Sequence, residues 1–153
     1  MKALMAVVLA GVMLAGCAQM EAKPQAPTTA EVEAFVEEAV AYARDRGKEE
    51  ALKTFTAPGG LFHRGQLYIY AYDFNCVCLA HGLQPELVGK DLTQHRDSRG
   101  LLVIQKLAEI ARRGKGWLRF YWKSPETGKE AAKLGYVMKV DDTWWLGSGT
   151  YGR

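Results

Sequence analysis

The sequence lacks the short motifs that mark the common classes of enzyme. It has no nucleophile motif, no metalloprotease motif and no phosphate-binding loop. Its Gly147-Ser148-Gly149 does not have the spacing of a Gly-x-Ser-x-Gly nucleophile elbow. The Cys-x-x-Cys-His pattern of haem attachment is also missing. We therefore expect neither enzymatic activity nor a cofactor.

Charge of one sign is not in excess either. The chain has 20 Lys and Arg against 17 Asp and Glu, a formal net charge of +3 over 153 residues. The basic residues are scattered, whereas a protein that binds nucleic acid gathers them in a patch or stripe. No internal repeat or low-complexity block is present, and the length fits one globular domain. Nucleic acid is therefore not an expected partner.

Metal ligands are scarce, with three cysteines and three histidines in the whole chain. Cys78 and His81 form a Cys-x-x-His pair of a kind that binds metals, but no second pair of ligands is near it in the sequence. On a regular strand Cys76 and Cys78 would share one face, with Cα atoms roughly 6.6–6.8 Å apart. That separation is the upper limit for a disulfide, which would be strained and reducible. A labile Cys76–Cys78 disulfide, two packed thiols, and a redox or metal function with His81 all remain open.

Only one long apolar run is present, at the beginning of the chain. It covers residues 3–14, follows Lys2, and is shorter than the roughly 20 residues of a spanning helix, so it is typical of a signal peptide. Leu14-Ala15-Gly16-Cys17 resembles the bacterial lipobox, in which the cysteine is lipidated. The resemblance implies a signal peptide over 1–16, a lipid on Cys17 and export. Ala18 stands where an aspartate would favour inner-membrane retention, so we expect anchoring to the outer membrane, facing the periplasm.

A short tether and a long helix follow the expected lipid. Residues 17–27 contain two prolines and no apolar period, which is typical of a linker, and a domain is expected over 28–153. Thr28 and Glu31 fit a capping box at the start of a helix with apolar residues at spacings of three and four. The helix is expected to break near Gly47, resume, and end at residues 58–60.

Alternating patterns predict strands in most of the remaining chain. Residues 66–74 are apolar or aromatic on both faces, which predicts a strand covered on both sides, with 76–80 as its hairpin partner. A second helix is expected after Gly100, and further strands at 117–123, 132–140 and 144–151. The fold class is thus α+β: a PAS-like antiparallel sheet of about five strands, with the long N-terminal helix on one face and the connecting segment on the other.

From about Val32 to Tyr151 the chain resembles a bacterial single Cache domain, a PAS-like extracytoplasmic sensor module. The resemblance implies binding of a small organic ligand, often a carboxylate or amino acid, rather than catalysis. It is carried by an ordered series of short stretches: Leu67-Tyr-Ile-Tyr-Ala-Tyr-Asp73, Leu79-Ala-His81, Pro85-Glu-Leu-Val-Gly-Lys-Asp-Leu92, Asp97-Ser-Arg-Gly100, Gly114-Lys-Gly-Trp117, Phe120-Tyr-Trp122, Lys133-Leu-Gly-Tyr-Val137 and Trp145-Leu-Gly-Ser-Gly-Thr-Tyr151.

Two features depart from the family pattern. Cys76 stands where the family usually has glycine, and because cysteine tolerates a positive φ poorly we expect a locally different turn. A Cache receptor also continues into a transmembrane helix and a cytoplasmic transmitter, whereas this chain stops at Arg153. We therefore expect a freestanding binder that presents its ligand to a membrane-bound signalling or transport partner.

Six residues are the expected ligand contacts, in a cavity between the sheet and the connecting segment. The resemblance implies that Lys133 and Tyr136 contact the ligand: the lysine could pair with a carboxylate while tyrosine hydroxyls donate hydrogen bonds. Lys133 and Tyr136 are three apart, so both can face one cavity only at a bulge or a strand end. Alternatively, the aromatic residues simply fill the core of a structural lipoprotein. The six residues are Tyr70, Tyr72, His81, Tyr121, Lys133 and Tyr136.

Overall fold

The computed structural model describes residues 25–152, so the expected signal peptide (1–16), Cys17 and most of the tether (17–27) lie outside the described residues. The helices are α1 (Thr29–Arg46), α2 (Lys48–Thr56), the 3-10 helix η1 (Pro85–Leu87) and α3 (Val103–Arg112). The strands are β1 (His63–Arg64), β2 (Leu67–Tyr68), β3 (Tyr70–Asp73), β4 (Cys78–His81), β5 (Lys115–Lys123), β6 (Glu130–Lys139) and β7 (Trp144–Tyr151).

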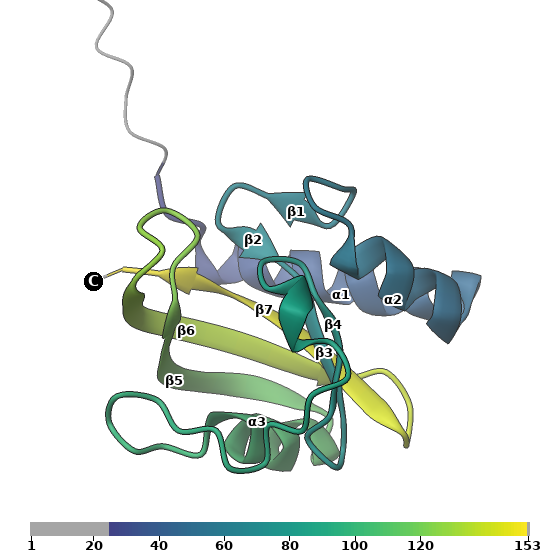
Figure 1. Cartoon of the computed structure of the whole chain (residues 1–153). Coiled ribbons are helices and arrows are strands. Elements are labelled where there is room, and N and C mark those ends of the chain that lie inside the picture. Colours follow the sequence, from purple (N-terminus) through teal and green to yellow (C-terminus); the bar gives the residue numbers. More distant parts are fainter. Residues whose placement is uncertain (1–24, 153) are drawn as a thin grey trace, which may run out of the picture.

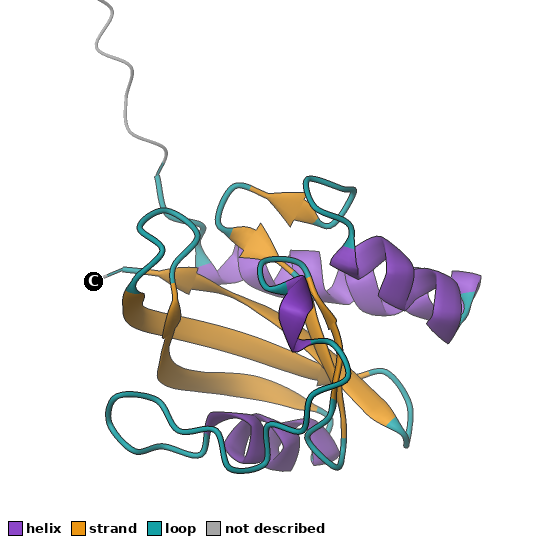
Figure 2. Ribbon diagram, in the orientation of Figure 1, coloured by secondary structure: helices purple, strands orange, loops and turns teal. Residues whose placement is uncertain are grey.

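Five strands form one antiparallel sheet in the order β4-β3-β7-β6-β5. Figure 1 shows α1 and α2 along one face of this sheet, with α3 and the segment that leads into it along the other. Figure 2 shows the resulting three layers, helix, sheet and helix. The α+β, PAS-like arrangement predicted from the order of elements is confirmed.

The expected strand over 66–74 divides in two. β2 pairs with β1 in a separate hairpin that the sequence pattern did not predict, and β3 joins the main sheet. The division falls at Ile69, whose carbonyl accepts a hydrogen bond from the Gly82 N–H at 2.9 Å. The alternation of faces nevertheless holds across the break, because the odd-numbered residues face α1 and the tyrosines face α3.

The N-terminal helix begins and ends where its sequence signals predict. The Glu31 N–H donates to the Thr28 hydroxyl at 3.2 Å, and the Thr28 N–H donates to the Glu31 carboxylate at 2.7 Å, so the capping box is confirmed. Gly47, with φ of +84°, separates α1 from α2 at the predicted break. The apolar stripe of α1 is buried against the sheet and consists of Val32, Phe35, Val36, Ala39, Val40 and Ala43.

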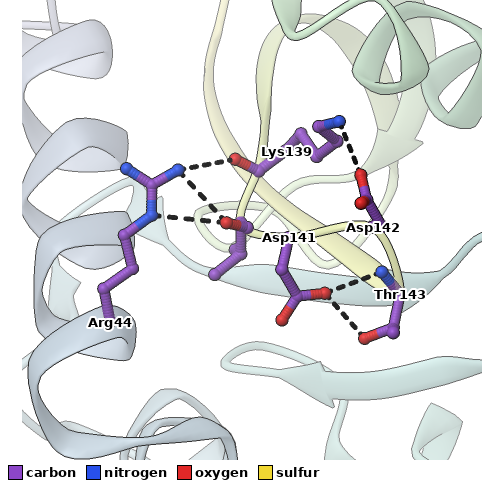
Figure 3. Close-up of polar contacts among 6 residues, drawn as sticks. Arg44, Lys139, Asp141, Asp142 and Thr143 are labelled. Atoms are coloured by element: carbon purple, nitrogen blue, oxygen red, sulfur yellow. Dashed lines mark hydrogen bonds and ion pairs between the residues drawn. The ribbon is translucent and has the colours of Figure 1, made fainter.

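Polar contacts fasten the C-terminal end of α1 to the hairpin between β6 and β7 (Figure 3). The Arg44 guanidinium donates to the Val140 carbonyl at 3.1 and 3.3 Å. Within the hairpin, the Asp141 carboxylate accepts the backbone N–H and the hydroxyl of Thr143, both at 2.7 Å. The helix layer is therefore fixed to the sheet by hydrogen bonds as well as by apolar packing.

The turn between β3 and β4 keeps a left-handed residue although glycine is absent. Cys76 has φ of +67°, the only positive value at a described residue other than glycine. The Asp73 carboxylate accepts the N–H groups of Asn75 and Val77, both at 2.9 Å, and so holds the turn closed. The backbone of Cys76 therefore adopts the left-handed conformation that cysteine tolerates poorly, at a cost of roughly 1–2 kcal/mol.

The same turn explains the state of the two cysteines. Cys76 lies within the turn and Cys78 begins β4. The two cysteines are therefore not alternate positions of one regular strand, which was the geometry assumed in estimating their Cα–Cα separation. Both are buried, free thiols in the structure. Of the three alternatives that the sequence leaves open for Cys76 and Cys78, the structure contains the pair of packed thiols.

Candidate functional site

A small cavity lies between the sheet and α3, where the Cache resemblance predicts a ligand. The volume within which the centre of a water molecule can move is about 10 Å³, which is roughly the space that one bound water needs. A ligand of several heavy atoms can enter only if the cavity widens. The lining residues are Tyr70, Tyr72, His81, Ile104, Leu107, Phe120, Trp122 and Lys133.

Four of the six expected contacts meet at this cavity, and two do not. Tyr136 lies on the opposite face of β6, in the core beneath α1, with its ring 4.8 Å from that of Trp117. The pairing of β6 with both neighbours runs without a register shift from Lys133 to Met138. No bulge brings Tyr136 to the side of Lys133, so their three-residue spacing puts them on opposite faces.

Tyr121 also points away from the cavity, and Trp122 lines it instead. Phe120 and Trp122 share one face of β5 in the core beneath α3. The Tyr121 ring lies half-buried under the Arg99 guanidinium, 4.8 Å from the ring centre. Sequence alternation required that only one of Tyr121 and Trp122 face the cavity, but it did not say which.

Lys133 is a fully enclosed cation with no acidic partner. Its side chain is 1% exposed, and no ion pair involving it is formed among the described residues. The ammonium donates to the Tyr68 hydroxyl at 2.8 Å and lies over the rings of Tyr68, Tyr70 and Tyr151 at 4.1, 4.7 and 4.9 Å. Burial lowers its pKa well below the usual value. An anion in the cavity would supply the missing counter-charge.

Glycines on β6 and β7 make room for these side chains against the sheet. A Cβ on Gly149 would lie 2.8 Å from Cε of Lys133 and 2.6 Å from the Leu134 carbonyl oxygen. One on Gly147 would lie 2.9 Å from the Tyr70 ring and 2.5 Å from the Tyr136 carbonyl oxygen. The two glycines therefore allow neighbouring backbone and side chains to approach this strand closely.

We expect Gly149→Ala to lower the free energy of unfolding by about 2 kcal/mol, because the new methyl group overpacks the strand contact beside Lys133. Urea denaturation measures this change. Thr150→Val is the matched control, since it replaces only the Thr150 hydroxyl, which has no hydrogen-bond partner, and should leave stability nearly unchanged. Equal stability of Gly149→Ala and the wild type would contradict the close approach.

His81 is held in one neutral tautomer. Its Nδ1 accepts the backbone N–H groups of Leu83 and Gln84, at 3.3 and 3.0 Å, so the proton of the neutral ring lies on Nε2. Burial, and secondarily the Lys133 charge, lowers the pKa of His81 to about 3. The Gln84 side chain also accepts the indole N–H of Trp122 at 3.0 Å. The segment after β4 thus fixes two walls of the cavity.

Tyr72 brings a hydroxyl without a partner to the same cavity. The side chain is 1% exposed, and the hydroxyl makes no hydrogen bond in the structure, whereas that of Tyr70 donates to the Ser148 carbonyl at 3.1 Å. Burial, and secondarily the neighbouring Cys78 thiol, raises the pKa of Tyr72 well above its usual value, so it stays a neutral donor. A buried donor left unsatisfied is unfavourable and indicates a missing acceptor.

We expect Tyr72→Phe to keep or raise the stability of the unliganded protein by up to about 1 kcal/mol, because an unpaired buried hydroxyl is removed. A ligand that accepts a hydrogen bond from this hydroxyl should bind the variant about tenfold more weakly, the value of one good hydrogen bond. Tyr70→Phe is the control: it breaks the bond to Ser148 and should destabilise by about 1 kcal/mol. Denaturation and calorimetric titration give both quantities. A clear loss of stability in Tyr72→Phe would mean that its hydroxyl already has a partner.

The described residues contain no group of three or more His, Cys, Asp or Glu side chains placed to hold a metal ion. Within the same part of the chain, no helix is long and apolar enough to cross a membrane.

The cavity offers one ammonium, from Lys133, one imidazole N–H, from His81, and one free hydroxyl, from Tyr72, beside an apolar wall. The wall residues Ile104, Leu107, Phe120 and Trp122 were not among the sequence-predicted contacts.

Comparison with known proteins identifies a family and individual relatives. Residues 18–152 match the family model for single Cache domain 2. The sensor histidine kinase MctS of Rhizobium johnstonii is 32% identical over 85 residues, which are 55% of this chain and 18% of that protein. The methyl-accepting chemotaxis protein McpP of Pseudomonas putida is 27% identical over 118 residues, 76% of this chain and 21% of that protein. The chain thus spans about a fifth of the length of these relatives.

Solved structures of sensor domains share the fold. A methyl-accepting chemotaxis protein from Vibrio parahaemolyticus superposes with a TM-score of 0.72 at 28% identity, over 80% of this chain and 86% of the other. A periplasmic sensor domain of a chemotaxis protein gives 0.65 at 28% identity, over 79% and 88%. A third structure, described as the basis for carboxylic acid recognition by a Cache chemosensory domain, gives 0.63 at 25% identity, over 79% and 84%.

Proposed function

This chain belongs to the single Cache domain 2 family, and we propose that it senses a short-chain monocarboxylate in the periplasm. The observation that carries the proposal is Lys133, a buried ammonium without an acidic partner at the wall of a closed cavity. The His81 N–H and the free Tyr72 hydroxyl are neutral donors that line the same space. A carboxylate would pair with the charge and satisfy the orphaned hydroxyl.

The lining of the cavity favours a single negative charge on a small apolar body. No acidic residue lines it, so the ammonium of an amino acid would be desolvated without a partner and repelled by Lys133. A second carboxylate would meet Ile104, Leu107 and Phe120. Because the closed cavity holds only about one water, small ligands such as acetate and propionate need the least widening. We therefore prefer a monocarboxylate to the amino acid that the family resemblance also allows.

The relatives support sensing rather than catalysis. The curated matches are a sensor kinase and a chemotaxis receptor, and one structural neighbour is described as recognising a carboxylic acid. We propose that the ligand-bound domain acts on a membrane-bound signalling or transport partner. The ligand contacts proposed here are Tyr70, Tyr72, His81 and Lys133, with Trp122 in place of Tyr121 and without Tyr136.

Matched pairs of small molecules test the ligand class. The chain from Ala18 onward is titrated calorimetrically with acetate and glycine, propionate and alanine, and propionate and succinate. Each pair differs by one ammonium or one carboxylate group. We expect binding, and a rise in melting temperature through linkage, with acetate and propionate alone. Equal binding of glycine and acetate would reject the monocarboxylate assignment, and no binding by any compound would reject the carboxylate sensor.

The lipid anchor is a separate part of the proposal. The lipobox-like Leu14-Ala15-Gly16-Cys17 supports attachment to the outer membrane through Cys17. Cell fractionation and intact-mass measurement test it: the wild type should be found in the membrane fraction with the added mass of the lipid. Cys17→Ala should lose both. Recovery of the wild type with an unmodified Cys17 would reject the anchor without affecting the ligand assignment.

A further inference from the structure

A chain of three short hydrogen bonds leads from Lys133 away from the cavity. The ammonium bonds to the Tyr68 hydroxyl at 2.8 Å, and this hydroxyl bonds to that of Tyr151 at 2.7 Å. The Tyr151 hydroxyl in turn donates to the Lys123 carbonyl at 2.7 Å. Tyr68 and Tyr151 do not line the cavity, so a ligand would touch the first member of the chain and none of the others.

The chemistry of its two ends fixes the direction of every proton in this chain. The Lys123 carbonyl can only accept a hydrogen bond, so the Tyr151 hydroxyl donates its one proton to that oxygen. Tyr151 must then accept from Tyr68, and the Tyr68 oxygen is left to accept from the ammonium, which can only donate. The three bonds are therefore oriented alike and polarise one another, with the positive charge of Lys133 at the head.

The far end of the chain is where several separate segments meet. Tyr151 is the last residue of β7 and Lys123 the last of β5. Gln66 accepts the Tyr151 N–H at 3.3 Å and donates to the Glu126 carboxylate at 2.6 Å, so the β5–β6 turn joins the same cluster. Figure 1 shows this turn and the end of β7 beside the beginning of α1. We call Gln66, residues 123–130 and Tyr151 the terminal cluster.

We propose that Tyr68 and Tyr151 are positioning residues that couple ligand binding at Lys133 to the terminal cluster. The proposal rests on the carboxylate site proposed above. Without ligand, the described residues stabilise the lysine charge through the Tyr68 oxygen and the surrounding rings, and the charge polarises the three hydrogen bonds. A carboxylate in the cavity forms an ion pair with the Lys133 ammonium and draws Nζ toward itself. The bonds from Tyr68 to Lys123 then weaken, and the terminal cluster loosens when the ligand binds.

Hydrogen exchange of the full chain, with sodium propionate as the probe, tests the coupling. Peptides covering residues 121–131 and 148–152 should exchange at least threefold faster with saturating propionate than without it. Tyr151→Phe should lose this difference while binding propionate within about threefold of the wild type. Tyr42→Phe is the matched control, because its hydroxyl bonds to Thr54 within the helix layer, at 3.2 Å, and it should behave like the wild type.

The outcomes separate the coupling from the ligand site. If calorimetry shows propionate bound to the wild type but exchange at the terminal cluster is unchanged, the coupling is rejected and the carboxylate site stands. Retention of the full difference in Tyr151→Phe also rejects it. If neither propionate nor acetate binds the wild type, the site and the coupling fall together. Tyr68→Phe, which breaks the chain at its middle, serves as the second variant if Tyr151→Phe does not fold, and it should give the same loss.

Discussion

Replacing Lys133 with methionine is expected to abolish carboxylate binding and, at the same time, to stabilise the unliganded domain. Methionine keeps most of the length of the side chain but removes a buried charge that has no acidic partner. Exchanging buried charge for apolar volume is often neutral or stabilising by 1–4 kcal/mol, and we expect about 2 kcal/mol. Loss of the one cation among the described residues that line the cavity should weaken propionate binding at least 100-fold.

Urea denaturation and calorimetric titration measure the two effects of Lys133→Met. Lys139→Met is the matched control, because Lys139 lies on the same strand but forms a partly exposed ion pair with Asp142. It should change both stability and affinity very little. A large loss of stability in Lys133→Met would mean that the ammonium stabilises the unliganded fold and would argue against a role reserved for ligand binding.

Acid is expected to unfold the domain through His81. The pKa of this side chain is about 3 in the folded protein and near 6.5 when the chain is unfolded. Between pH 3 and pH 6.5, His81 is protonated in the unfolded state but neutral in the folded state, so the free energy of unfolding falls as the pH drops. The slope from this one group is about 1.4 kcal/mol per pH unit below 6.5, and the contribution is fully present above that pH.

His81→Asn isolates this contribution, because the amide oxygen can still accept the Gln84 N–H but the side chain no longer titrates. Between pH 6.5 and pH 4.5 the variant should lose about 2–3 kcal/mol less stability than the wild type. Denaturation at pH 8 supplies the internal baseline, since the histidine is then neutral in both states and only packing differs. Parallel curves for the two proteins would reject a neutral, buried His81.

The parts of the fold that sequence predicts are those governed by local rules. The capping box at Thr28 and the break at Gly47 each depend on residues a few positions apart, and both are confirmed. The alternation from Leu67 to Tyr72 likewise predicts which side chains share a face, because strand period is a property of the backbone. The β1–β2 hairpin carries no comparable pattern, since each of its strands is only two residues long.

The site depends on information that no local pattern contains. Whether Tyr121 or Trp122 faces the cavity is decided by the pairing of Phe120 with Lys133, which is a matter of register between two strands. Tyr136 was selected through family resemblance although its spacing from Lys133 already argued for the opposite face. The wall contributed by Ile104 and Leu107 depends on where α3 docks, and this is a tertiary contact.

The near-closure of the cavity bears on timing and sensitivity. If the binding-competent form is a minority, the apparent affinity is the intrinsic affinity reduced by its population, and association at high ligand concentration becomes limited by opening. The bond between the Trp122 indole and the Gln84 side chain lies at the wall and would be strained by such opening. Substitutions at Gln84 could therefore retune the concentration range to which the domain responds without changing any group that touches the ligand.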